Sequence, residues 1–178
     1  MTEKYYEAVE KGRRILASSS CDYAEIRLSS SVGTGISLSG ENVDSFTIGE
    51  SVAGSVRVLK NGSWGFSTFN DLSMLERFFA GAVSSASILS PADKSVISHG
   101  IPLNGVFETA VQRDFADITP DEKYALLKRY NDILRAPGPV QTTRAGYRDV
   151  NMKYTFMNSE GSLLSYDKKY CGISLASI

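Results

Sequence analysis

The sequence has few of the residue types from which metal sites and nucleophilic catalytic sites are usually built. Its 178 residues include one histidine and two cysteines. A single histidine cannot form a two-histidine zinc site, and no Cys-x-x-Cys pair replaces it. We therefore predict no metal ligand and no catalytic residue in this chain. His99 lies in Ser98-His99-Gly100-Ile101-Pro102, a segment punctuated by glycine and proline, and we interpret it as a solvated loop residue.

Neither a surplus of one charge sign nor a long apolar run is present. The chain has 19 basic and 20 acidic residues and a formal charge of −1. Because a basic face supplies much of the affinity for nucleic acid, we expect no nucleic-acid partner. The charged N-terminal segment and the lack of a spanning-length apolar stretch predict no membrane partner and a cytoplasmic location. Without a secretion signal, Cys21 and Cys171 are expected to be reduced and partly buried.

What the sequence does contain is the composition of a globular protein, with 42% hydrophobic and 22% charged residues. Three segments carry the apolar period of amphipathic helices. The first runs from Thr2 to about Ser18. The second opens with the capping-box pattern Ser73-Met74-Leu75-Glu76, contains small residues that suit close packing on a sheet, and ends at Pro91. The third opens at Thr119-Pro120-Asp121-Glu122 and stops at Ala136-Pro137-Gly138-Pro139.

Other segments alternate apolar and polar residues with a period of two, which predicts strands. They span 23–29, 43–48, 52–60, a short piece near 105–109, 140–147, 149–157 and 162–178. Turn signals lie at 40–42 and 158–161, and we expect 140–147 to pair with 149–157. The predicted fold class is therefore α+β, with a mainly antiparallel or mixed sheet packed against about three helices.

The stretch RVLKNGSWGF at 57–66 predicts a hairpin with Asn61 and Gly62 as the turn, because a type I′ turn needs positive φ at both central residues. In this register Lys60 faces Ser63, Leu59 faces Trp64, Val58 faces Gly65, and Arg57 faces Phe66. Paired residues share a sheet face. One face therefore carries Arg57, Leu59, Trp64 and Phe66, and the other carries Val56, Val58, Gly65 and Ser67.

Two interpretations of the face with Arg57, Trp64 and Phe66 remain open. In the first, a helix packs over it and Arg57 lies on an aromatic ring, which is favoured because aromatic residues beside a hairpin are more often core. In the second, these three side chains form a substrate- or partner-facing platform for an extended peptide or a partner chain. Exposure of Trp64, the single tryptophan of the chain, discriminates between them.

Several segments together resemble the N-terminal region of the TldD/PmbA family, whose members were named modulators of DNA gyrase and are understood as zinc metallopeptidases. The matching pieces are DYAEIRL at 22–28, SVRVL at 55–59, NGSWGFST at 61–68, FAGAV at 79–83, Glu122-Lys123 and NSEG at 158–161. Their order and spacing cover nearly the whole chain. The residues that match as fold markers are Arg57, Trp64, Gly65, Phe66, Asn158 and Gly161.

The resemblance implies that residues 1–178 are the N-terminal domain of a protein well over twice this size. The alternation that continues to Ile178 also predicts a chain cut from a longer one. The family's zinc site resembles His-Glu-x-x-x-His in a C-terminal β-rich domain, and no segment here matches it. We therefore expect no cofactor in this chain and zinc in the missing C-terminal domain. The implied partners are that domain, a homo- or heterodimer partner of the same family, and a peptide substrate.

The function that follows is a non-catalytic domain, inactive alone, that helps to form the peptide cleft and the dimer of a metallopeptidase. The full-length protein would then carry out proteolysis of small or unfolded peptides. The alternative is a stand-alone, non-catalytic module that binds a protein or peptide through the Arg57, Trp64 and Phe66 face. A third alternative pairs a serine with His99 in a hydrolase, although no Gly-x-Ser-x-Gly motif accompanies that histidine.

Overall fold

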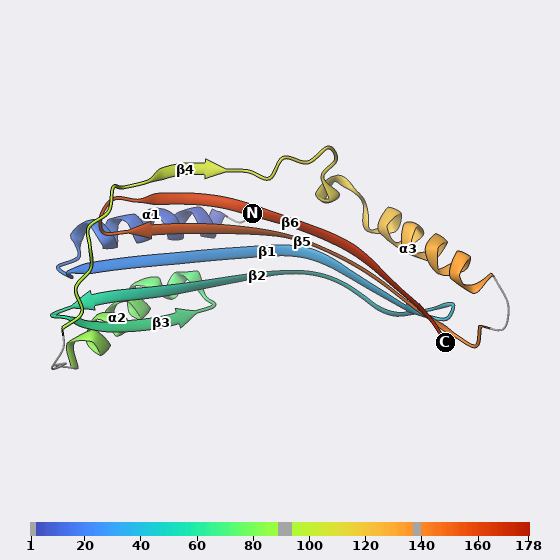
Figure 1. Cartoon of the computed structure of the whole chain (residues 1–178), viewed down its shortest axis with the longest axis horizontal. Coiled ribbons are helices and arrows are strands. Elements are labelled where there is room, and N and C mark those ends of the chain that lie inside the picture. The colour runs from blue at the N-terminus through green and yellow to red at the C-terminus, as the bar shows by residue number, and fades with distance from the viewer. Residues whose placement is uncertain (1–2, 89–93, 137–139) are drawn as a thin grey trace. The chain divides into compact units, whose positions relative to one another are not determined.

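The computed structural model describes residues 3–88, 94–136 and 140–178. Within these ranges the helices are α1 (Glu3–Ser18), α2 (Leu75–Ile88) and α3 (Pro120–Arg135), with short 3₁₀ helices at Leu72–Met74 and Phe115–Asp117. The strands are β1 (Tyr23–Ser39), β2 (Asn42–Lys60), β3 (Ser63–Phe69), β4 (Asn104–Phe107), β5 (Thr143–Asn158) and β6 (Leu163–Ser177). They form a sheet in the order β3-β2-β1-β5-β6-β4, and the parallel pairing of β4 with β6 makes it mixed (Figure 1). The predicted α+β class is confirmed.

The described residues divide into two compact units. Unit 1 comprises those within Met1–Ser30, Ser51–Glu108 and Lys153–Asp167. Unit 2 comprises those within Ser31–Glu50, Thr109–Met152 and Lys168–Ile178. The four long strands β1, β2, β5 and β6 each contribute residues to both units.

The predicted breaks inside β1 and β2 are wrong. Each strand is continuous, whereas the sequence pattern separates 23–29 from a glycine-rich segment and 43–48 from 52–60. The prediction treated glycine as a break, but among the described residues positive-φ glycines occur at Gly40, Gly62 and Gly161. A glycine with an extended backbone, such as Gly49 in β2, does not interrupt a strand.

The predicted pairing of 140–147 with 149–157 is also wrong. Both stretches belong to β5, whose neighbours in the sheet are β1 and β6. Tyr147 and Asp149 are both buried, so the alternation runs through Arg148 without a turn. The short predicted strand near 105–109 is present as β4, shifted by one or two residues.

The Asn61-Gly62 hairpin is confirmed. The φ angle is 53° at Asn61 and 82° at Gly62, so both central residues adopt the left-handed conformation that a type I′ turn requires. The pairing of β2 with β3 is antiparallel and matches the predicted register from Lys60 with Ser63 to Arg57 with Phe66. A two-residue turn fixes which residues oppose each other, and therefore which side chains share a face.

In unit 1, α1 and α2 pack on one face of the sheet and form an apolar core. Gly65 explains how closely α2 approaches β3, because a Cβ at this position would lie 1.9 Å from the carbonyl oxygen of Ala82. This confirms that the small residues of α2 serve close packing on the sheet. The fully or almost fully buried members of the core include Tyr5, Ala8, Leu16, Ala24, Ile26, Leu28, Val56, Val58, Leu75, Ala82, Ala86 and Met157.

In unit 2, α3 begins with the predicted capping box. The Thr119 hydroxyl accepts a hydrogen bond from the backbone N–H of Glu122, and the Glu122 carboxylate accepts one from the backbone N–H of Thr119. The apolar residues under the helix are fewer than in unit 1, namely Ile36, Leu38, Leu127, Ala145 and Tyr147, with Tyr124 packed against them.

Buried polar groups complete the contact between α3 and the strands of unit 2. The Lys123 ammonium lies 2.7 Å from Oδ2 of Asp149, which also accepts a hydrogen bond of 2.6 Å from Tyr147. The other oxygen of Asp149 accepts the backbone N–H of Thr34 at 3.0 Å. Burial and the bond to Asp149 raise the pKa of Tyr147. Because both oxygens of this carboxylate have partners, we interpret the cluster as a structural contact that holds α3 on the strands of unit 2.

The remaining predictions on single residues have mixed outcomes. Both cysteines are free, but Cys171 is exposed while Cys21 is half-buried, so the predicted partial burial holds for one of the two. His99 is exposed as predicted, and its Nδ1 lies 2.8 Å from a carboxylate oxygen of Glu160. The predicted helix stops at Pro91 and at 137–139 lie outside the described residues. In the described part of the chain no helix is long and apolar enough to cross a membrane.

Candidate functional site

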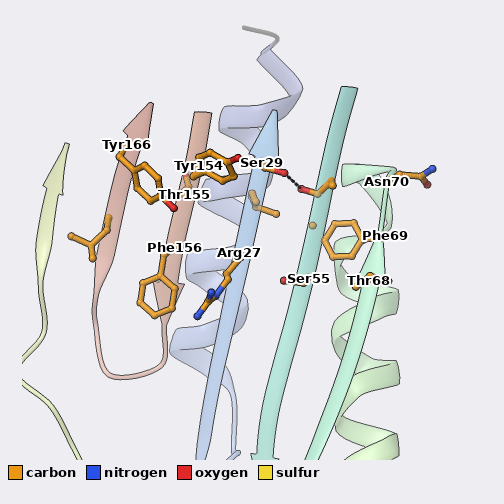
Figure 2. A pocket seen from close by; sticks show the side chains of 14 residues that line it. Arg27, Ser29, Ser55, Thr68, Phe69, Asn70, Tyr154, Thr155, Phe156 and Tyr166 are labelled. Atoms are coloured by element: carbon orange, nitrogen blue, oxygen red, sulfur yellow. Dashed lines mark hydrogen bonds between the residues drawn. The ribbon is translucent and has the colours of Figure 1, made fainter. Parts of the chain in front are cut away.

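Among the described residues of unit 1, no helix covers the second face of the sheet. Strand residues alternate between the two faces, so the neighbours of the buried core residues point to this side. Figure 2 shows the side chains of Arg27, Tyr154, Phe156 and Tyr166 projecting from the sheet, with helix ribbons behind it. We name this surface the helix-free face. It is defined by Tyr23, Glu25, Arg27, Arg57, Leu59, Trp64, Phe66, Tyr154, Phe156, Leu164 and Tyr166.

A buried carboxylate organises the charged part of the helix-free face. Glu25 is 5% exposed and lies 3.2 Å from Arg27 and 3.2 Å from Arg57. The Tyr23 hydroxyl donates to the same carboxylate at 2.8 Å. Burial, followed by this hydrogen bond to Glu25, raises the pKa of Tyr23 to about 12. One carboxylate therefore orients two guanidinium groups, and the cluster retains one net positive charge.

The three residues predicted to face a substrate or partner lie together. The Arg57 guanidinium carbon lies 4.6 Å from the centre of the Trp64 ring, which confirms the predicted cation–π contact. Tyr23 meets Trp64 edge to face, with ring centres 6.2 Å apart. Trp64 is 37% exposed and Phe66 is 62% exposed. Their role toward a substrate or partner stays a prediction.

The prediction that a helix packs over this face is wrong. The helix on the hairpin is α2, and it contacts the side that carries Gly65 and Ser67, whose hydroxyl donates to the carbonyl of Phe78 at 2.8 Å. Alternation defines two faces for a hairpin, but it does not determine which of them the helix takes. The choice follows from glycine, because the face with Gly65 allows the closer approach of a helix backbone.

A groove of about 1040 Å³ extends along the helix-free face. It is lined by residues of β1, β2, β3, β5 and β6, together with Asn70 at the end of β3 (Figure 2). Tyr154 and Tyr166 stack along one side, with ring centres 5.0 Å apart, and Arg27 lies over the Phe156 ring at 5.4 Å. The hydroxyl-bearing residues Ser55 and Thr68 line the other side. The groove therefore combines aromatic walls, small polar groups and an arginine.

Sequence analysis missed most of this groove. It placed Tyr23, Glu25 and Arg27 in one strand, but the strand pattern gave no reason to bring them next to Arg57. Tyr154, Phe156 and Tyr166 come from β5 and β6, more than 100 residues after Arg27 in the sequence. The signal available was their alternation with polar or buried neighbours, which predicts a shared face only once the strand order is known.

The described residues do not fit a metal site. No group of three or more histidine, cysteine, aspartate or glutamate side chains that could hold a metal ion occurs among them. His99 has one carboxylate neighbour, Glu160, and Cys171 is an exposed strand residue. A structural or catalytic zinc ion needs at least three protein ligands.

The fold and the surface together define an α+β region with an exposed face of aromatic and arginine side chains. Two family profiles identify the family to which this region belongs. The profile described as PmbA/TldA metallopeptidase domain 1 matches residues 24–86. The profile described as the PmbA/TldA metallopeptidase central domain matches residues 113–178. Together the two matches cover more than half of the chain. The chain belongs to the PmbA/TldD family of metallopeptidase-related proteins.

Curated relatives agree with this assignment. A metalloprotease of Synechocystis sp. is 32% identical over 151 residues, which are 82% of this chain and 32% of the relative. A metalloprotease of Methanothermobacter thermautotrophicus is 29% identical over 145 residues, 80% of this chain and 31% of the relative. The chain thus spans about one third of the length of the curated relatives that it matches.

Solved structures share the fold. A protein of Bacteroides thetaiotaomicron named as a candidate modulator of DNA gyrase superposes with a TM-score of 0.76 at 18% identity, covering 99% of this chain and 41% of that one. A protein of Thermotoga maritima with a similar name gives 0.73 at 20% identity, covering 97% and 39%. TldE of Thermococcus kodakarensis gives 0.63 at 15% identity, covering 98% and 39%. At these identities the likeness concerns the fold alone.

Proposed function

We propose that this chain is the non-catalytic N-terminal region of a TldD/PmbA-type metallopeptidase and that its helix-free face forms part of the wall of the peptide-substrate cleft. The observation that carries the proposal is the exposed cluster of Arg57, Trp64 and Phe66 on a face that the helices of unit 1 leave uncovered, in which Glu25 orients Arg57. Family membership supports the proposed class of reaction, and the exposed surface supports the proposed role.

The chemistry of the helix-free face suits an extended peptide. Aromatic rings offer large contact areas at a small cost in conformational entropy, and arginine donates several hydrogen bonds to peptide carbonyls or carboxylates. Residues of these types are enriched at the energetic centres of protein interfaces. The near-zero net charge of the chain argues against nucleic acid as the competing ligand.

In this proposal, activity depends on parts beyond the described residues. Zinc and its ligands lie in a C-terminal domain of the longer protein, and a homo- or heterodimer partner of the same family completes the cleft. The activity of the longer protein is proteolysis of small or unfolded peptides in the cytoplasm. The 178-residue chain alone cleaves no peptide.

The test uses the longer polypeptide from the source organism with Trp64 and Phe66 both changed to alanine. We expect the KM for an unfolded peptide to rise about tenfold while kcat stays within about twofold, because the removed contacts bind substrate and transition state alike. The matched control is Tyr6→Ala, which removes an exposed aromatic ring from α1, on the covered side of unit 1. An unchanged KM in the double variant would overturn the proposal.

A stand-alone binding module remains the second candidate, because the same exposed cluster could act without a catalytic domain. The intact mass of the native polypeptide, captured from source cells with an antibody against this region, separates the two. A mass well above 19.4 kDa supports the cleft-wall function. A mass of 19.4 kDa supports the module.

A further inference from the structure

The groove on the helix-free face has a simple charge pattern. Fourteen described residues line it, and Arg27 is the charged one among them. No aspartate or glutamate side chain lines the groove in the described part of the chain. A ligand in the groove therefore meets one positive charge and no negative one, which favours an anionic group near Arg27.

Arg27 is held in position before any ligand arrives. Its Nη2 lies 3.2 Å from Oε1 of Glu25, and its guanidinium lies 5.4 Å from the centre of the Phe156 ring. A guanidinium has five N–H donors, and the side chain of Arg27 is 62% exposed, so donors remain available toward the groove. Glu25 is shared with Arg57 and Tyr23, so its charge does not neutralise both arginines. Binding to such a fixed donor costs less entropy than binding to a mobile side chain.

The walls next to Arg27 are aromatic and aliphatic. The Phe156 ring lies next to the guanidinium, and the stacked pair of Tyr154 and Tyr166 continues the aromatic surface (Figure 2). Leu164 also lines the groove. A volume of about 1040 Å³ is enough for a few residues of a peptide. The site thus places an anion-binding group and an apolar wall within one side-chain length of each other.

From this juxtaposition we propose that the groove binds the C-terminal end of a peptide, with its terminal carboxylate on Arg27 and an aromatic or aliphatic last side chain against Phe156 and Tyr154. A C-terminal residue carries its carboxylate and its side chain on the same carbon, which matches the short separation of the two features. The proposal rests on the proposed function, in which unit 1 contacts peptide, and it names the part of the peptide that this groove recognises.

The test measures binding to the 178-residue chain by calorimetry. The probes are two octapeptides of one sequence that ends in phenylalanine, one with a free terminal carboxylate and one with a terminal amide. We expect the acid to bind about tenfold more tightly, the size of effect that a charge-assisted hydrogen bond gives. Arg27→Gln should weaken the acid to the level of the amide and leave the amide unchanged. The control Arg77→Gln, in an exposed arginine of α2, should change neither.

Two further probes sharpen the result. An acid peptide that ends in glycine should bind about tenfold more weakly than the one that ends in phenylalanine, because it lacks the apolar side chain. An amidated peptide with an internal glutamate should bind no better than the plain amide. Arg27→Lys keeps the charge but loses the planar fork, and it should retain part of the preference for the acid.

Several outcomes would overturn the proposal. They are equal affinities of acid and amide for the unaltered chain, an unchanged preference in Arg27→Gln, and preference for the internal glutamate. The first comparison needs no variant, so it decides even if Arg27→Gln does not fold. Failure here, with a raised KM in the Trp64 and Phe66 double variant, would reject the carboxylate site and keep the cleft-wall function.

Discussion

The two units hold their helices against the sheet in different ways. In unit 1, α1 and α2 bury large apolar side chains such as Ile26 and Leu75, and a glycine in β3 lets the helix backbone come close. In unit 2, the face of α3 that meets the strands buries Lys123, Leu127 and Asn131. Two of these three residues are polar, so the position of α3 depends on hydrogen bonds and charge pairing as well as on packing.

Because the four long strands contribute to both units, the same strands support an apolar contact in unit 1 and a largely polar one in unit 2. Apolar burial is tolerant of small changes, and it keeps one face of unit 1 well covered while the other carries the groove. A buried ion pair contributes little net stability but penalises any arrangement that leaves one partner alone. Unit 2 is therefore expected to be the more sensitive of the two to loss of a single polar group.

The largest expected effect is that of Asp149→Ala. The change leaves the buried Lys123 ammonium without its carboxylate and should lower the free energy of unfolding by about 3–5 kcal/mol, measured by chemical denaturation. Hydrogen exchange should locate the loss of protection in α3. The matched control is Asp132→Ala, which removes an exposed partner of Lys128 and should cost less than about 1 kcal/mol.

A double variant separates the effect of charge from that of packing at the Lys123–Asp149 contact. Changing Lys123 to methionine and Asp149 to leucine together removes both charges, so it should be more stable than Asp149→Ala alone. If the double variant is less stable than Asp149→Ala, the interpretation that charge pairing holds α3 on the strands of unit 2 is wrong.

Next in size is Leu75→Ala in unit 1. Leu75, the first residue of α2, is completely buried, and its truncation should cost about 3 kcal/mol through lost burial and a residual cavity. Protection in hydrogen exchange should fall in α2 and β3 and stay unchanged in α3. Ile88→Ala, at the exposed end of the same helix, serves as the control and should cost less than about 0.5 kcal/mol. A loss of protection confined to α3 would break the distinction between the units.

A smaller effect is expected from Thr119→Ala, which removes the N-terminal cap of α3. The loss should be about 1 kcal/mol, because the hydroxyl accepts the backbone N–H of Glu122. Thr119→Ser keeps the hydroxyl and should restore most of the stability. Thermal melting of the two variants side by side measures the difference, and equal melting temperatures would exclude a role of the cap.

The last prediction concerns pH. The pKa of Tyr23 is raised from 10.0 to about 12, so the folded state favours the neutral hydroxyl. Its contribution to stability is fully present below pH 10.0 and is lost as the pH rises from there to about 12. Subtracting the tyrosinate absorbance of Tyr23→Phe from that of the unaltered chain isolates this group. A midpoint near 10.0 would contradict the buried Tyr23–Glu25 contact.

Local features of the fold were predictable, and features that depend on distant strands were not. The Asn61-Gly62 turn fixed the register of β2 and β3, and the Thr119 capping box fixed the start of α3, because both signals lie within four residues. The continuous course of β5 and its place between β1 and β6 had no local signal. Neither did the pairing of Lys123 with Asp149, which are 26 positions apart in the sequence.

In the candidate site, too, features with a local sequence signal were predictable and features that depend on distant strands were not. Arg57, Trp64 and Phe66 share a face as the hairpin predicts, since their positions depend on one turn. Arg27 and Phe156 are brought together on that face only through strand order, so the groove could not be predicted from the sequence alone. Which face the helices cover was predicted wrongly, because the alternation of side chains is symmetric between the two.

The fluorescence of Trp64 during titration of the 178-residue chain with an unfolded peptide shows whether the helix-free face binds peptide. The chain has one tryptophan, so the whole signal reports on the helix-free face. We expect an emission that soluble quenchers reach in the free chain, and a saturable change with protection from quenching as peptide binds. An emission that stays constant and equally accessible while calorimetry records peptide binding would contradict a peptide-binding role of Trp64 and Phe66.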